Sequence, residues 1–304
     1  MKGKGVNMFF RTDMALERRD LYKKANKLEE IEGIECEEDT VDDIAITRVK
    51  ITNERGEEAL QRKQGEYITI DIKKITNITT EKEQKIIDVF SKELSKLIDK
   101  HINKKEEILI VGLGNELATP DSLGAKVVQN VEITRHIKLF LPDAIDKNTR
   151  TISAITPGVL GTTGIETIEI VKGIVDNVKP KLIIAIDSLC SKKIDRINRS
   201  IQISDTGIVP GGGVGNRQEE LSIKTLGIPV IGLGVPTVLD AATIVIDTLN
   251  ACKIEVSEEE ILNEMMLNNF NFIVTPKEID SLIENMATIV SEGINMCIWS
   301  KKKY

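Results

Sequence analysis

Residues 108–115 read ILIVGLGN, which is a run of four apolar residues followed by a glycine-rich turn. Two later stretches repeat the pattern: residues 182–187 read LIIAID, and residues 230–234 read VIGLG. Strands that are apolar on both faces belong in the middle of a parallel sheet. Stretches with a helical pattern follow or separate these runs, near residues 121–131, 164–178 and 238–252. This alternation predicts an α/β protein with a doubly wound, mostly parallel sheet flanked by helices.

Other regions flank this core sheet, which we place within residues 107–252. Two runs within residues 44–72 alternate apolar and polar residues, as half-exposed strands do, and they predict a small peripheral β-containing part near the N-terminus. Residues 257–298 read as two C-terminal helices. We therefore expect residues 14–304 to form a single α/β domain.

The composition argues against several classes of ligand and partner. The 304 residues carry 41 Lys and Arg against 48 Asp and Glu, a net charge of −7, which argues against direct binding of nucleic acid. The four cysteines form no CxxC pair and there are only two histidines, so the sequence predicts no metal site and no cofactor. No apolar run approaches the length of a membrane span, and we expect a cytoplasmic protein.

The active site of an open α/β sheet lies beyond the carboxyl ends of its strands. Asp187 directly follows an apolar run, so its carboxylate should be desolvated and its pKa open to a shift. Asp121 follows a proline where a helix is expected to begin, and taken alone it also fits a simple helix-start aspartate. Two adjacent carboxyl groups, one ionised and one protonated, can serve as general base and general acid. Asp121 and Asp187 are therefore the candidate catalytic residues.

Secondary candidates lie in the next segment. Asp205-Thr206-Gly207 matches the D-T-G signature of pepsin-like proteases, but those enzymes are all-β and need two copies, so a turn is the simpler interpretation. Residues 210–216 read PGGGVGN, and their N–H groups, including those of Gly213 and Gly215, could hold an anion or oxyanion. A mobile glycine loop is equally compatible with that stretch. No GxGxxG, P-loop or GxSxG motif is present.

Ten short motifs occur along the chain in an order typical of one known family. They are VGLGN at 111–115, TPDSLG at 119–124, ITRH at 133–136, PGV at 157–159, GIET at 164–167, IAID at 184–187, IQISDTG at 201–207, GVGN at 213–216, PTV at 236–238 and VTPKE at 274–278. In these motifs the chain resembles the spore germination endoprotease family, from Arg11 onward.

The resemblance implies an unusual aspartic-type endopeptidase that degrades small acid-soluble spore proteins, which coat DNA in the spore core, during germination. The family's proposed catalytic aspartates fall on Asp121 and Asp187. The resemblance also implies a fold similar to that of hydrogenase maturation proteases, a homotetramer, and a zymogen that removes its own N-terminal segment. The stretch between Cys252 and Phe272 is shorter here than in the family.

A self-cleavage site is expected between Asp13 and Met14. Residues 11–17 read RTDMALE, which places an acid, a large apolar residue, alanine, a spacer and a second acid in a row. By resemblance, this order is similar to the sites that the family cuts in its substrates, so residues 1–13 are the expected propeptide. The polar, glycine-containing segment before the site suits a mobile tail, although an ordinary disordered terminus would have the same composition.

Two alternative functions stay open at this point. One is a maturation endopeptidase that acts on a metalloenzyme precursor, against which the shortage of histidines counts. The other is a non-catalytic binder of spore proteins that has kept the scaffold.

Overall fold

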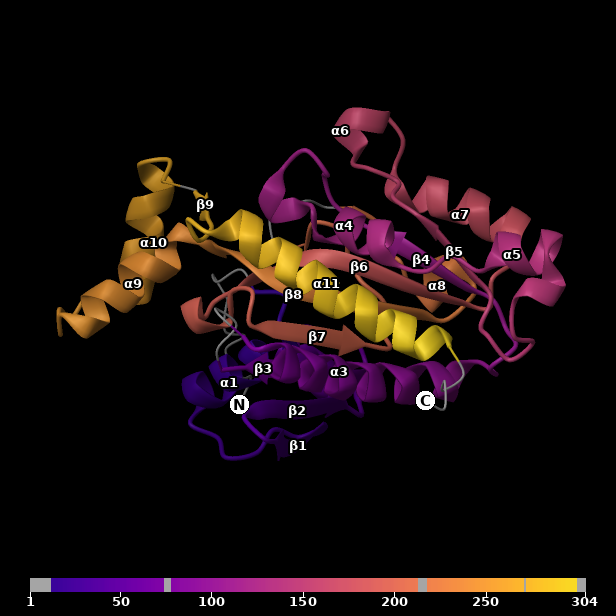
Figure 1. Cartoon of the computed structure of the whole chain (residues 1–304). Coiled ribbons are helices and arrows are strands. Elements are labelled where there is room, and N and C mark those ends of the chain that lie inside the picture. The colour runs from indigo at the N-terminus through magenta and orange to yellow at the C-terminus, as the bar shows by residue number, and fades with distance from the viewer. Residues whose placement is uncertain (1–11, 74–77, 213–217, 271, 300–304) are drawn as a thin grey trace.

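The structure is a computed structural model and describes residues 12–73, 78–212, 218–270 and 272–299. In this part of the chain, nine strands form one sheet in the order β1-β2-β3-β7-β8-β6-β4-β5, and β9 pairs with β8 (Figure 1). The strands are β1 Ile34–Val41, β2 Ile44–Ile51, β3 Gly65–Ile72, β4 Ile108–Gly112, β5 Ile152–Ile155, β6 Leu182–Ser191, β7 Ser200–Ser204, β8 Val230–Asp240 and β9 Ile273–Val274.

The three apolar runs form neighbouring parallel strands, as predicted. β4 lies between β5 and β6, β6 pairs with β8, and all three pairings are parallel. The expectation of a mostly parallel sheet is wrong, because β7, β3, β2 and β1 continue the sheet in antiparallel pairings. The strands within residues 44–72 therefore extend the main sheet. β1 was not predicted, because its residues IECEEDTV are mostly charged or polar and lie at the exposed edge.

Helices cover both faces of the parallel part, so the mixed α/β class with a helix-flanked open sheet is confirmed (Figure 1). α3, α4 and α11 pack together over one face, while α7 lies against the other. The helices are α1 Ala15–Asn26, α2 Glu54–Leu60, α3 Thr80–His101, α4 Leu123–Asn130, α5 Arg135–Phe140, α6 Leu160–Thr163, α7 Thr167–Val178, α8 Ile223–Leu226, α9 Ala241–Ala251, α10 Glu258–Leu267 and α11 Ile279–Ile298, with short 3-10 turns η1 Thr119–Asp121, η2 Pro142–Ala144 and η3 Ile194–Arg196.

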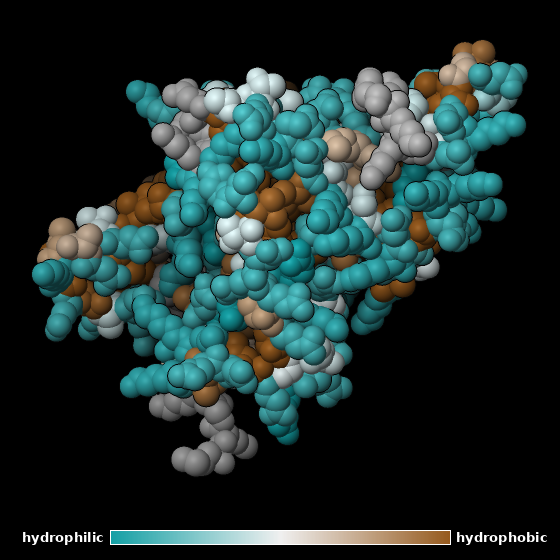
Figure 2. All heavy atoms as spheres, turned by 60° about the horizontal axis from the view of Figure 1, so that its bottom comes forward, coloured by the Kyte–Doolittle hydropathy of each residue, from teal (hydrophilic) through white to brown (hydrophobic). Residues whose placement is uncertain are grey.

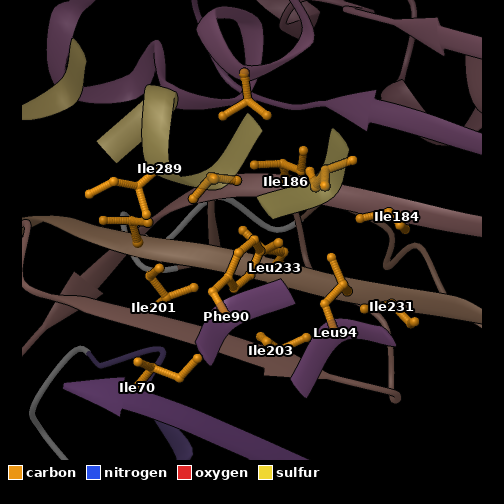
Figure 3. Close-up of a cluster of buried hydrophobic side chains, with 14 of the residues drawn as sticks. Ile70, Phe90, Leu94, Ile184, Ile186, Ile201, Ile203, Ile231, Leu233 and Ile289 are labelled. Carbon is orange, nitrogen blue, oxygen red and sulfur yellow. The ribbon is translucent and has the colours of Figure 1, made fainter. Parts of the chain in front are cut away.

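Alternation along the central strands divides the apolar core in two. Ile184 and Ile186 of β6 belong to the cluster under α3, α4 and α11, whereas Ile183 and Ala185 face α7. This is the side-chain period of two that a strand imposes, here apolar on both faces. Figure 3 shows the larger cluster, in which Phe90 of α3 lies among isoleucine and leucine side chains from β6, β7 and β8. The double burial fixes the position of β6, the strand that carries Asp187.

Two features lie outside this core. A third apolar cluster packs α1 and α2 against β2 and β3, so the N-terminal helix is held to the sheet. α9 and α10 project from one end of the body as an arm (Figure 1), and Figure 2 shows hydrophobic residues on that projecting end. Within the described residues, no helix combines the length and the apolar character that crossing a membrane would need.

Candidate active site

Asp187 lies in the interior of β6, where its neighbour β4 stops. The last pair between these strands is Gly112 with Ile186, while β6 continues to Ser191 beside β8. The prediction that Asp187 ends its strand is thus wrong, although the carboxyl end of β4 does mark the site. Because β4 stops one residue earlier, the edge of β6 at Asp187 is left open to other groups.

Asp121 reaches this place from the chain that follows β4. It is the last residue of η1, and Ser122 alone separates it from α4. Gly114 has φ +97°, and a Cβ there would lie 2.1 Å from the Asp121 carbonyl oxygen, so only glycine allows this close approach. The backbone N–H of Asn115 donates to Asp121 Oδ2 over 2.7 Å and fixes the carboxylate.

The two carboxyl groups are electrostatically coupled. Asp187 is 2% exposed, and it accepts hydrogen bonds from two backbone N–H groups, from Ser188 to Oδ1 at 2.9 Å and from Gly211 to Oδ2 at 3.1 Å. Burial raises the pKa of Asp187 well above its ordinary value, and the negative charge of Asp121 raises it further. Burial also raises the pKa of Asp121, and the Asn115 N–H partly opposes that rise.

A cavity of about 290 Å³ contains both carboxyl groups. Among its described lining residues there is no lysine, arginine or histidine, so none of them supplies a positive charge to the pair. Two adjacent carboxyl groups without a cation lose their protons in separate steps, and the more deeply buried group holds its proton to higher pH. Its other polar lining residues include Ser188, Gln218, Thr237 and Thr275.

The expected cleavage site lies beside this cavity. The Asp13 N–H donates to the Cys190 carbonyl and the Cys190 N–H donates to Asp13 Oδ2, both over 2.9 Å. The charge of Asp13 is one of those that raise the pKa of Asp187. Met14 is fully buried, so the Asp13–Met14 bond does not lie on a free tail. Residues 1–11 of the expected propeptide lie outside the described residues.

Of the secondary candidates, Asp205 is described and does not join the pair. Asp205 accepts a hydrogen bond from the Glu66 N–H over 2.8 Å and lies in the turn after β7, outside the cavity lining. Gly213 and Gly215 lie outside the described residues. Their neighbour Gly211 does reach the site, because its N–H holds Asp187.

Sequence reasoning did not single out Ser188, Cys190, Gln218 or Thr237 as cavity residues. Ser188 and Thr237 both belong to strands that continue past the site. The available signal was a polar residue inside an otherwise apolar strand, as at Thr237. Among the described residues, no three His, Cys, Asp or Glu side chains come together as a possible metal site.

Comparisons with known proteins agree on one family. The model of a family described as germination protease matches residues 11–259. A germination protease of Clostridium acetobutylicum is 44% identical over 95% of this chain and 94% of its own length. One from Caldanaerobacter subterraneus subsp. tengcongensis is also 44% identical, with the same coverage, and one from a Geobacillus species is 37% identical over 95% of this chain and 93% of its own.

Proposed function

Because the chain belongs to the germination protease family, we propose that it is an aspartic-type endopeptidase that begins the degradation of small acid-soluble spore proteins in the spore core. The observation that carries the catalytic type is the buried Asp187 beside Asp121, in a cavity whose described lining offers no cation. Such a pair shares one proton, and the deeper burial of Asp187 assigns that proton to Asp187.

Hydrolysis then needs one water and the two carboxyl groups. The ionised Asp121 takes one proton from the water as the water oxygen bonds to the peptide carbonyl carbon. Asp187 first hydrogen-bonds the carbonyl oxygen and then gives its proton to the departing nitrogen as the C–N bond breaks. The products are a carboxylic acid and an amine. The proton now on Asp121 returns to Asp187 by exchange with solvent.

A cysteine-type reaction is disfavoured by the same burial. Cys190 lines the cavity, but burial raises the pKa of its thiol to about 12, so the nucleophilic thiolate is scarce at neutral pH. We expect turnover to survive treatment of the folded enzyme with iodoacetamide.

The test is cleavage of a purified small acid-soluble spore protein by the full-length chain, followed by gel electrophoresis and mass spectrometry. Discrete fragments with the wild type, and none with Asp121→Asn, are the expected result. Retention of the spore protein on the immobilised wild type without fragments would instead support a non-catalytic binder. Cleavage by Asp121→Asn at the wild-type rate would contradict the aspartic-type mechanism.

We also propose that the chain cuts itself between Asp13 and Met14. Support comes from the position of Asp13 beside Asp187 and from the resemblance of residues 11–17 to a substrate. Because Met14 is fully buried, the bond must leave its present place before it can be cut, so we expect slow processing. Intact-mass analysis in mildly acidic buffer should show loss of residues 1–13 from the wild type and not from Asp187→Asn. Equal trimming of both would indicate a contaminating protease and contradict the proposal.

A homotetramer is the proposed assembly. The arm of α9 and α10, together with the segment that follows α10, exposes a group of apolar side chains of the kind that soluble monomers seldom gather: Val245, Met266, Leu267, Phe270 and Phe272. Sedimentation equilibrium should give a tetramer for the wild type and a smaller species for Leu267→Glu. A wild type that sediments as a monomer would contradict this proposal.

A further inference from the structure

Three buried polar atoms in the catalytic cavity have no hydrogen-bond partner in the described structure. They are Ser188 Oγ, Gln218 Oε1 and Thr237 Oγ1, and all three residues line the cavity that contains Asp121 and Asp187. Buried polar side-chain atoms are normally paired, because burying an unpaired one costs free energy. Three such atoms around one cavity indicate that a polar group absent from the protein itself completes the site.

Thr237 is the clearest of the three. It is 0% exposed, so its hydroxyl has no alternative contact with bulk solvent. It lies on β8 at an irregularity in the pairing with β6: Leu189 pairs with Pro236 and Cys190 with Val238, which leaves Thr237 as an extra residue without a partner in the ladder. A β-bulge of this kind changes the direction of a side chain and is frequent next to active sites.

The backbone around the bulge is held in place. The Thr275 hydroxyl donates to the Thr237 carbonyl over 2.8 Å, and the Asn198 N–H donates to the Pro236 carbonyl over 2.6 Å. These bonds satisfy the carbonyl groups of the bulge and leave the Thr237 hydroxyl unsatisfied. A valine would fill the same volume without a buried hydroxyl, so packing alone does not account for threonine here.

We propose that the Thr237 hydroxyl holds the attacking water, by accepting a hydrogen bond from the hydrogen that the water keeps while Asp121 takes the other. The inference rests on the proposed hydrolysis at Asp121 and Asp187. A hydroxyl suits this task because it both accepts and donates hydrogen bonds. Thr237 transfers no proton. Its bond orients the lone pair of the water oxygen toward the peptide carbonyl carbon, and the Ser188 hydroxyl is the second group available to the bound water or substrate.

The test compares Thr237→Val with Thr237→Ser and with a matched control, Thr149→Val. Thr149 is also 0% exposed and has a buried, unpartnered hydroxyl in the described structure, but it does not line the cavity. Both valine variants should melt at or above the wild-type temperature, since each removes a buried unsatisfied hydroxyl. For Thr237→Val alone, kcat on a spore-protein peptide should fall on the order of 10- to 100-fold at unchanged KM, as expected for loss of a hydrogen bond in a charged network.

Thr237→Ser decides between a polar and a packing role, because it keeps the hydroxyl and loses the methyl group. Recovery of most of kcat supports the proposal, and a kcat as low as that of the valine variant overturns it. Wild-type kcat in a folded Thr237→Val also overturns it. Asp187→Asn is assayed in parallel: activity in that variant would refute the proposed catalytic pair, whereas an inactive Asp187→Asn with an active Thr237→Val refutes only the role of Thr237.

Discussion

Two buried carboxylates lie on or against β6, and they differ in how far the surrounding groups compensate their charge. Asp187 lies on the strand itself, and Glu17 of α1 meets the end of the strand; each is 2% exposed. Glu17 accepts hydrogen bonds from the hydroxyls of Thr12 and Ser191 at 2.5 and 2.6 Å and from the Lys192 N–H at 2.7 Å, and it pairs with the Arg196 guanidinium at 3.4 Å. Asp187 has two backbone N–H partners and a second carboxylate beside it.

The difference is the one expected between a structural carboxylate and the catalytic carboxyl group that we propose at Asp187. Around Glu17 the donors and a cation compensate the charge, and the group ties α1 to β6 and to η3. Around Asp187 no described lining residue carries a positive charge, and the two backbone N–H groups offset only part of the effect of burial, so its pKa stays well above the ordinary value. Burial alone would not distinguish the two carboxylates. Substitutions at each site, and a change of pH, test whether charge compensation distinguishes them.

The largest effect is expected at Asp187. Asp187→Asn keeps the size and the backbone hydrogen bonds of the group but removes its exchangeable proton, so turnover should fall on the order of 10²- to 10⁴-fold. Steady-state cleavage of a spore-protein peptide measures the loss, and circular dichroism confirms the fold. A folded variant that cleaves at near the wild-type rate would eliminate Asp187 as a catalytic residue.

Glu17→Gln should have the opposite effect to Asp187→Asn, because it should lower stability and leave turnover nearly unchanged. It removes one of the two anionic partners that the described residues give the buried Arg196 and leaves Asp71, 3.3 Å away, so it should lower the free energy of unfolding on the order of 3 kcal/mol. Urea denaturation measures this change, and turnover per folded molecule should stay near wild type. The control is Asp20→Asn on the same helix, where the partner Lys193 is exposed and the expected loss is below about 1 kcal/mol. Equal losses at both positions would mean that the buried ion pair of Glu17 stabilises the fold no more than the exposed ion pair of Asp20.

The pH dependence of stability sharpens the comparison. The raised pKa of Asp187 means that the folded protein holds this proton more tightly than the unfolded chain does. The Asp187 contribution to the free energy of unfolding should therefore be largest below the unfolded pKa and fall as pH rises toward the folded pKa, by up to about 1.4 kcal/mol per pH unit. Urea denaturation at a series of pH values from about 4 upward should show this fall in the wild type relative to Asp187→Asn. Parallel curves for the two proteins would mean that Asp187 titrates normally.

A smaller effect than at Asp187 or Glu17 is expected at Asp205, whose carboxylate supports a turn. Asp205→Asn weakens the hydrogen bond from the Glu66 N–H and should lower the free energy of unfolding by about 1 kcal/mol, with turnover reduced far less than by Asp187→Asn. Thermal melts and the same peptide assay measure both quantities. If Asp205→Asn proves to be the more damaging change for turnover, the catalytic carboxylate has been misassigned.

The sequence predicted what depends on local pattern. Apolar runs located β4, β6 and β8, and the carboxylate that follows LIIAI led to Asp187. The continuation of β6 past Asp187 was not predicted. Residues 187–191 read DSLCS, and this polar sequence looks like a loop until its tertiary partners are known. The buried Glu17 escaped notice for a similar reason, since its partner Arg196 is 179 residues away in sequence. The bulge at Thr237 depends on the register of two strands, which no single segment encodes.

The premature end of β4 has a mechanical consequence. Because β6 and β8 run on together past Gly112, Asp187 occupies a notch in the edge of a continuing sheet, with ladder hydrogen bonds on both sides of it along the strand. A residue held in that way cannot drift with the loops around it. We therefore expect that changes in the length or sequence of the loops near the notch leave the position of the Asp187 carboxyl group relative to the sheet unchanged.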